Sequence, residues 1–143
     1  MFKTLLPFLA TALVMTAQIA TAKPVPENAP TAAECVAPTT QKRMNDCAYE
    51  DFLAATASYA ESNKFVSNQL SGQQRDLFRR SQKAWIGFSA AACDFESSAV
   101  KGGSAQGMVK WQCMARMSRA RVVELKAMGN CTEGDLGCVR FKR

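Results

Sequence analysis

Six cysteines constrain the fold of this chain more than any other feature of its sequence. No two of them form a CxxC motif, so the spacing is not that of a thioredoxin-type redox site or a zinc knuckle. If the chain leaves the cytosol, an even number of cysteines predicts three disulfides, with buried free thiols as the alternative. The cysteines are Cys35, Cys47, Cys93, Cys113, Cys131 and Cys138.

The first 22 residues have the pattern of a removable export signal. Lys3 precedes an apolar run from Leu5 to Val14, and Ala20 and Ala22 place small residues where a signal peptidase cleaves. The run is shorter than the about 20 residues needed to span a bilayer. We therefore expect residues 1–22 to be removed and no membrane span to remain. No cysteine stands at the cleavage point to carry a lipid, since the next one is Cys35, so we expect a periplasmic or secreted protein.

The preferred disulfide pairing joins cysteines that are neighbours in the sequence. The first pair would tie a proline-rich, extended lead-in at residues 23–38 to the first long helix, and the second would close a helical hairpin. A loop of about 15 to 20 residues closed in this way gains ~3 kcal/mol in the chain-entropy model. Spacing alone leaves other connectivities open. The preferred pairs are Cys35 with Cys47, Cys93 with Cys113, and Cys131 with Cys138.

The helix on which the others are expected to pack runs from a cap at Ser71 to about Ser98, and its central stretch is residues 81–98. An apolar stripe with spacings of three and four usually faces inward. We therefore predict a core formed by Trp85, Phe88 and Phe95 together with Trp111 from a later helix, with an exposed binding anchor as the alternative for Trp85. The stripe consists of Leu77, Ser81, Ala84, Trp85, Phe88, Ala92 and Phe95.

Two further helices are expected on either side of this one. The first runs from Gln41 to Lys64 after a cap at Thr39 or Thr40, and the last carries an apolar stripe from Met108 to Leu125. Paired glycines after the central helix predict the connecting loop.

The fold predicted from these elements is all-α, a small three-helix bundle braced by disulfides. The helical domain is expected at residues 39–128, and residues 129–143 form a disulfide-closed tail. Ser71 is expected to cap the central helix. Gly87 lies inside that helix, which indicates a close approach of another helix backbone.

The charge of the chain is moderately basic. It has 18 Lys and Arg against 12 Asp and Glu, a net charge of +6, or +5 once Lys3 is removed with the leader. A basic surface favours acidic partners, and the alternative function is therefore an envelope adaptor that binds anionic polymer or a membrane surface. The excess is scattered, and we expect no nucleic-acid partner. Two basic groups are interpreted mostly as solvated helix faces: Arg79, Arg80 and Lys83, and Arg116, Arg119 and Arg121.

The sequence lacks the residues of common catalytic sites. It has no histidine, which removes Ser-His and Cys-His pairs and the commonest zinc ligand. Asp94 and Glu96 fall on different sides of a helix and form a weak carboxylate pair, and the GGS at residues 102–104 lacks the strand and lysine of a phosphate loop. We expect no enzyme, no cofactor and no bound metal.

Several stretches resemble the lysozyme-inhibitor family of the LprI type. The opening C…TQxxMNxCA is similar at Cys35, Thr40, Gln41, Met44, Asn45, Cys47 and Ala48. The central QRAWIxFRDAxCxFE is similar at Gln82, Lys83, Ala84, Trp85, Ile86, Phe88, Ala91, Cys93, Phe95 and Glu96. The closing CLxxLTxxRxxEL is similar at Cys113, Met114, Met117, Ser118, Arg121, Glu124 and Leu125.

The resemblance covers Cys35 to Leu125 and has departures. Ser89 and Ala90 stand where the family often has an Arg-Asp pair, and the last two cysteines lie beyond the shared region.

The resemblance implies a binding protein that inhibits lysozyme or a related peptidoglycan-cleaving muramidase by occluding its cleft. Two carboxylates perform the hydrolysis there, so a protruding segment that reaches them would block it. The candidate inhibitory loop is Lys101, Gly102, Gly103 and Ser104. Lys101 could pair with a cleft carboxylate and Ser104 could hydrogen-bond to it, whereas the alternative is that the loop only turns the chain.

The net charge complicates this expectation. Animal lysozymes of the common type are basic, so a basic inhibitor would be repelled from them at long range. Either an acidic face around Glu50, Asp51 and Glu61 offsets this repulsion, or the target is another wall-cleaving enzyme, or this protein has another function. The sequence leaves the target and the oligomeric state open.

Overall fold

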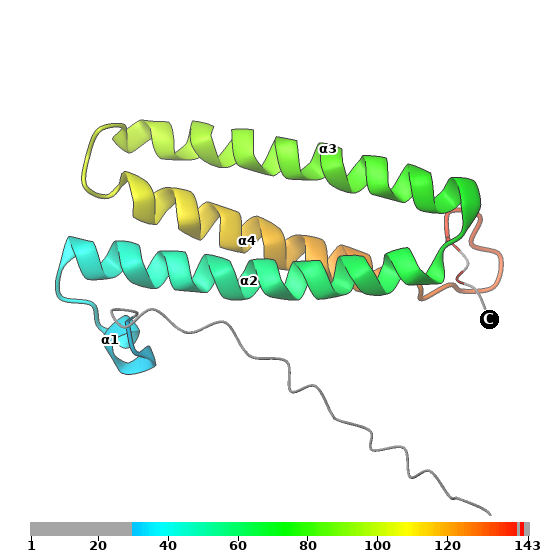
Figure 1. Cartoon of the computed structure of the whole chain (residues 1–143), viewed down its shortest axis with the longest axis horizontal. Helices are drawn as coiled ribbons and strands as arrows, with labels where there is room; N and C mark the ends of the chain where they lie inside the picture. The colour runs from blue at the N-terminus through cyan, green and yellow to red at the C-terminus, as the bar shows by residue number, and fades with distance from the viewer. Residues whose placement is uncertain (1–29, 140, 142–143) are drawn as a thin grey trace, which may run out of the picture.

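The structure is a computed structural model, and it describes residues 30–139 and 141. These residues form three long helices, one short helix and a 3₁₀ turn, with no strand among them (Figure 1). The prediction of an all-α fold is confirmed. The predicted export signal at residues 1–22 lies outside the described residues. The elements are α1 (Ala32–Val36), α2 (Gln41–Gln69), α3 (Gly72–Ser97), η1 (Ser98–Val100) and α4 (Gln106–Ala127).

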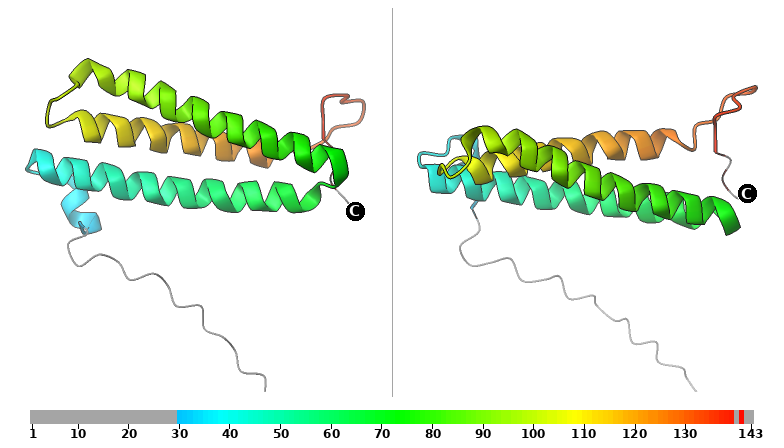
Figure 2. Two further views of the ribbon diagram at one scale, coloured as in Figure 1. Left: turned by 45° about the horizontal axis from the view of Figure 1, so that its top comes forward. Right: turned by 90° about the horizontal axis from the view of Figure 1, so that it is seen from above.

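The three long helices lie side by side in an elongated bundle. α2 and α4 run in the same direction and α3 runs in the opposite one, as two views show (Figures 1 and 2). α2 and α4 make the most extensive contact, α3 packs on α4, and α3 approaches α2 at few places. We call the end that carries α1, the start of α2 and residues 98–105 the loop end, and the opposite end the tail end.

The apolar core lies toward the tail end. Its largest members come from all three long helices, and Trp85 packs against it as predicted, with its ring centroid 4.9 Å from that of Tyr59. Trp111 is half-buried in a separate aromatic cluster, 5.0 Å from Phe52 and 5.1 Å from Tyr49 between ring centroids. The buried core residues are Tyr59, Val66, Leu70, Phe78 and Leu125.

The prediction that Phe88 and Phe95 belong to the core is wrong. Their exposed fractions are 64% and 80%. The buried positions follow the same spacing as the predicted stripe, but most lie one residue later in the chain, so α3 is rotated relative to the prediction. They are Phe78, Gln82, Ser89, Cys93 and Ser97.

The disulfide between Cys93 and Cys113 explains this rotation. Both cysteines are almost completely buried, at 0% and 1% exposure, between α3 and α4. Successive residues of a helix are about 100° apart around its axis. Phe88, five residues before Cys93, and Phe95, two residues after it, therefore point roughly 140° to 160° away from the cysteine. Once Cys93 faces α4, both phenylalanines must face solvent.

The helix ends agree with the sequence at some positions and differ at others. Thr40 caps α2, since its hydroxyl accepts a hydrogen bond from the Arg43 amide at 3.2 Å. Ser71 is the N-cap residue of α3 but makes no side-chain capping hydrogen bond. α2 continues five residues past the predicted Lys64. A Cβ placed on Gly87 would meet no atom of the described residues within 4 Å, so the helix approach expected there is not made by any described helix.

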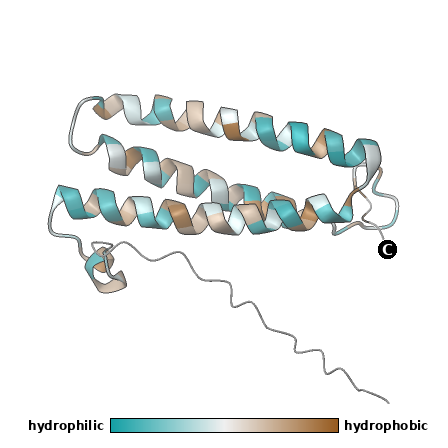
Figure 3. Ribbon diagram, in the orientation of Figure 1, coloured by the Kyte–Doolittle hydropathy of each residue, from teal (hydrophilic) through white to brown (hydrophobic). Residues whose placement is uncertain are grey.

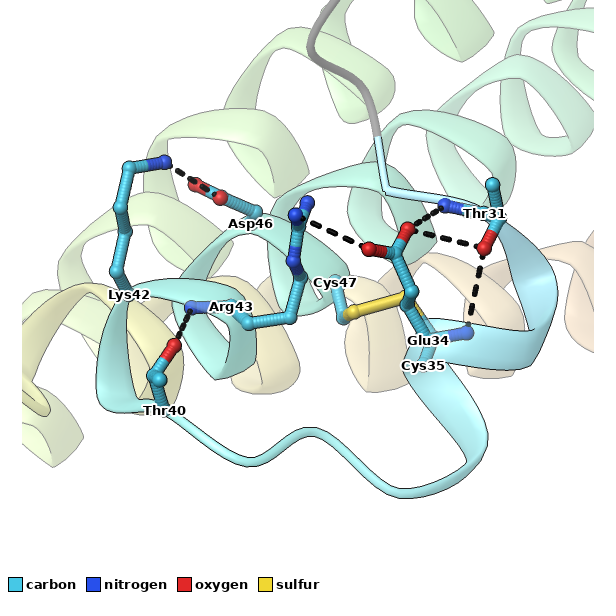
Figure 4. Close-up of a disulfide and its surroundings, with 8 residues drawn as sticks. All are labelled: Thr31, Glu34, Cys35, Thr40, Lys42, Arg43, Asp46 and Cys47. Atoms are coloured by element: carbon cyan, nitrogen blue, oxygen red, sulfur yellow. Dashed lines mark hydrogen bonds and ion pairs between the residues drawn. A yellow bond between two sulfur atoms is a disulfide. The ribbon is translucent and has the colours of Figure 1, made fainter.

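A short helix, α1, replaces part of the extended lead-in that the prolines predicted. The Thr31 hydroxyl accepts from the Glu34 amide at 3.3 Å, and the Glu34 carboxylate accepts from the Thr31 amide at 2.8 Å (Figure 4). This reciprocal capping box satisfies first-turn donors. The Thr31 amide and then its hydroxyl lower the pKa of the Glu34 carboxyl. Arg43 of α2 lies 3.1 Å from the same carboxylate, which joins α1 to α2.

The three disulfides are the preferred pairs. Cys35–Cys47 joins α1 to α2, Cys93–Cys113 joins α3 to α4, and Cys131–Cys138 closes a loop in the tail. Their Cα–Cα distances are 5.5, 5.5 and 5.4 Å. Spacing left the connectivity open, and the structure resolves it in favour of near neighbours.

The observed rotation of α3 predicts a large loss of stability at one position and a small loss at its neighbour. Phe78→Ala removes a buried ring and should lower the free energy of unfolding by about 3 kcal/mol or more, because Phe78 is 7% exposed. Leu77→Ala is the matched control, since Leu77 is 51% exposed, and should cost less than about 1 kcal/mol. Urea unfolding at low micromolar concentration measures both, and a larger loss for Leu77→Ala would contradict the rotation.

Candidate functional site

The loop that joins α3 to α4 stands at the loop end of the bundle (Figure 1). Lys101, Gly102, Gly103 and Ser104 are all exposed. Gly102 has a φ of +77°, which strongly favours glycine. A Cβ on Gly103 would lie 3.1 Å from the carbonyl oxygen of Val100. The two glycines are therefore needed for different reasons, and together they give the loop a narrow tip.

Hydrogen bonds inside the loop restrain its conformation. The Gly103 amide donates to the Val100 carbonyl at 2.9 Å, and the Lys101 amide donates to the Ser98 carbonyl at 3.1 Å. The Gly102 amide donates to the Gln106 side-chain oxygen at 2.9 Å. The loop is thus a folded turn rather than an open connection.

Asn45 of α2 connects this loop to the rest of the bundle. Its side-chain nitrogen donates to the Ser104 carbonyl at 2.9 Å, and its side-chain oxygen accepts from the Met108 amide at 3.1 Å. The Gln41 side chain donates to the same oxygen at 3.1 Å. Asn45 therefore holds the loop and the first turn of α4 against α2. Sequence reasoning noticed Asn45 only as part of a motif and missed this role.

The disulfide and a small buried serine close the base of the loop. In the Cys93–Cys113 disulfide, Cys93 lies one turn before the end of α3 and Cys113 about two turns after the start of α4. Ser97, one turn after Cys93, is 1% exposed. The hydroxyl of Ser97 donates to the Asp94 carbonyl at 3.2 Å, so it needs no other partner. The ends of the loop are fixed while its tip is presented to solvent.

Lys101 differs from the other cations near this end of the bundle. Lys42 pairs with Asp46, Arg43 with Glu34, and Lys110 with Asp94. Lys101 makes no ion pair within residues 30–139. The tip of the loop therefore carries a cation whose charge is available to an outside partner.

The two basic groups of the sequence have different surroundings. Arg116 pairs with Glu96, Arg119 with Asp51, and Arg121 with Glu124, so acidic side chains neutralise the second group. Arg79, Arg80 and Lys83 are exposed on α3 and form no ion pair with any described residue.

The predicted acidic groups do not gather into one site. Asp51 is occupied by Arg119, which leaves Glu50 and Glu61 on α2 without an ion-pair partner in the described part of the chain. Asp94 and Glu96 each face a separate cation of α4.

Among the described residues, no helix combines the length and apolar character that a membrane crossing requires.

The role of Asn45 predicts a local effect on the loop. Asn45→Ala leaves the Ser104 carbonyl and the Met108 amide without their partner and should lower the free energy of unfolding by about 1 to 2 kcal/mol. Amide hydrogen exchange should accelerate at residues 102–108, since Asn45 no longer holds this segment against α2. Asn68→Ala, at an exposed position of the same helix, is the control. Equal exchange in both variants would contradict the role of Asn45.

Comparisons with known proteins give the chain a family. The model of the family described as "Lysozyme inhibitor LprI" matches residues 32–125, which includes α1, α2, α3, the loop and all but the last two residues of α4. An uncharacterized protein of Rhizobium meliloti (strain 1021) is 26% identical over 113 residues, covering 70% of this chain and 81% of that protein. No solved structure matches the chain. Because the family model covers well over half of the sequence, this protein belongs to the LprI family of lysozyme inhibitors.

Proposed function

We propose that this protein is exported and inhibits lysozyme or a related muramidase by inserting the loop Lys101–Ser104 into the cleft of the enzyme. The single observation that supports the loop is its construction: an exposed tip whose lysine forms no ion pair with any described residue, held at its base by Asn45 and the Cys93–Cys113 disulfide. Family membership supports the target.

The chemistry of the target explains why such a loop would inhibit. Muramidases act through two carboxyl groups that flank the scissile bond. A lysine ammonium can form a charge-assisted hydrogen bond with one of them, which is stronger than a neutral one. Ser104 adds a hydroxyl next to the glycine turn. Occupation of the carboxylates and the space between them would exclude the glycan.

The fixed shape of the loop favours tight binding. A flexible loop loses conformational entropy when it is immobilised in a cleft, and this loss reduces affinity. In this protein the internal hydrogen bonds and the hydrogen bond from Asn45 to the Ser104 carbonyl have already restricted the loop before it meets a partner. More of the contact free energy is then available for binding.

The exported, oxidised state is part of the proposal. The three disulfides require an oxidising compartment to form and persist, and the substrate of a muramidase is outside the cytosol. We therefore place the protein in the periplasm or the extracellular medium.

Charge reversal at the tip tests the proposed contact. Lys101→Glu should raise the inhibition constant at least ~10-fold, because a carboxylate would face the cleft carboxylates. The thermal midpoint should stay nearly unchanged, since Lys101 is exposed. A turbidity assay of cell-wall lysis with several lysozyme types measures the inhibition constant.

Lys64→Glu is the control for this experiment, because it makes the same change in net charge at an exposed position of α2 away from the loop end. Inhibition that is unaffected by Lys101→Glu would remove the loop from the mechanism. An equal change in both variants would assign the effect to long-range charge rather than to the cleft.

An envelope adaptor is the second candidate function. Arg79, Arg80 and Lys83 on α3 favour it, because they form no ion pair with any described residue and three cations so close together attract anionic polymer. Binding of this kind weakens steeply with added salt, whereas a one-to-one complex with a lysozyme through the loop should tolerate salt better.

A further inference from the structure

The solvent side of α3 has the pattern of a helix–helix interface, although none of the described residues covers it. Positions 77, 81, 84, 88, 91 and 95 follow the alternating spacing of four and three that defines a coiled-coil seam. All six residues are exposed, and the three large ones are Leu77 at 51%, Phe88 at 64% and Phe95 at 80%. Large apolar side chains grouped on an exposed face mark an interaction surface.

We propose that this face binds the same face of a second copy of the chain, with the two α3 helices antiparallel. The first reason is the charge along one edge of the face. Arg80, Gly87 and Asp94 follow each other at intervals of seven residues, so they share one edge of the seam. The edge is therefore basic at its beginning, uncharged at its middle and acidic at its end.

Antiparallel pairing makes this edge complementary to itself. In an antiparallel pair the same edge of each helix meets its counterpart, so Arg80 of each copy lies opposite Asp94 of the other. Arg80 makes no ion pair within the described residues, and Asp94, which pairs with Lys110, keeps 60% of its side chain exposed. In a parallel pair, this edge would instead meet the edge with Phe78 and Trp85, which faces the core of the bundle and offers no charge.

Gly87 is the second reason. A glycine inside a helix costs about 1 kcal/mol relative to alanine, and no described residue lies close enough to Gly87 to need the space. In the antiparallel register that pairs Arg80 with Asp94, Gly87 of one copy lies opposite Gly87 of the other. The missing side chains would let the two helices approach most closely at the centre of the interface.

The residues of the seam also fit each other in size. In this register Phe88 lies against Ala84 of the second copy, Phe95 against Leu77, and Ser81 against Ala91. Each ring thus meets a smaller side chain, which is the alternation that packs well. The seam from Leu77 to Phe95 is ~27 Å long at 1.5 Å per residue. Figure 3 shows that α3 is hydrophilic where it begins and more apolar in its second half, where Phe88 and Phe95 lie.

Sedimentation equilibrium of the purified protein with its disulfides formed tests the proposal without any lysozyme. The wild type should form a dimer, and Phe88→Glu should weaken dimerisation at least ~30-fold, because loss of a central aromatic anchor typically has this effect. Ile86→Glu is the matched control, since Ile86 is half exposed on another side of α3 and outside the seam.

Gly87→Leu gives an independent variant in which folding is not at risk. Leucine is a better helix former than glycine, so the monomer should be at least as stable, whereas the dimer should be weakened because the helices can no longer approach. A dimer unchanged by both Phe88→Glu and Gly87→Leu would overturn the assignment of the face.

A charge exchange tests the orientation. Arg80→Glu alone and Asp94→Lys alone should each weaken the dimer ~10-fold, because both place like charges opposite each other. An equimolar mixture of the two variants should regain wild-type affinity as a heterodimer, since every opposed pair is then of opposite sign. No recovery in the mixture would contradict the antiparallel register.

The other possible occupant of the face is the lysozyme itself. A wild type with a dimerisation constant weaker than ~1 mM would overturn the proposal. If Phe88→Glu then also abolished inhibition, the face would be assigned to the enzyme. Because dimerisation is measured without the enzyme, its failure leaves the test of the inhibitory loop unaffected.

Discussion

The buried disulfide between Cys93 and Cys113 is the constraint on which the arrangement of this molecule depends. On the α3 side, the contact around it is formed by small side chains, since Ser89 and Ser97, one turn on either side of Cys93, are 2% and 1% exposed. Such a contact lets two helices approach closely but buries little apolar area. The serines of α3 donate to carbonyls of their own helix, so they are satisfied without a partner. The covalent bond thus takes over at the loop end the role that Leu125, Val66 and Phe78 have at the tail end.

The same bond determines what the loop can do. It fixes the ends of α3 and α4 just before the chain turns, and Asn45 fixes the turn from the side of α2. Neither restraint covers the tip. A rigid base with an exposed tip is what a cleft-blocking segment needs, because the entropy of ordering the loop has already been lost during folding. Positioning and presentation therefore follow from two contacts that lie far apart in the sequence.

Local signals in the sequence were sufficient for much of the fold. Helical periodicity located the three long helices, the paired glycines located the loop, and cysteine spacing favoured the pairs that the structure contains. The rotation of α3 was missed because an apolar stripe shows that a helix has a partner but does not say whether the partner belongs to the same molecule. The cysteine carried the decisive information, since Cys93 cannot face α4 while Phe88 and Phe95 face inward.

The short helix α1 was missed because the prolines of residues 23–38 predict an extended chain. The local signal for a helix start was the capping box of Thr31 and Glu34. The hydrogen bonds of Asn45 to Ser104 and Met108 join positions some 60 residues apart, which no local sequence pattern can predict.

The residues that carry the family resemblance in α3 serve two faces of the helix. Trp85 and Cys93 hold the bundle together, whereas Ile86, Phe88 and Phe95 point to solvent. Contacts on both of these faces explain why apolar residues lie on more than one side of α3 in its second half.

An antiparallel pair of α3 helices would place one Lys101 loop at each end of the dimer, because each loop follows the end of its own α3. The two loops would then point away from each other, too far apart to enter a single cleft. Each chain would therefore bind an enzyme of its own, and dimerisation would change the number of sites per particle without changing the chemistry at either tip.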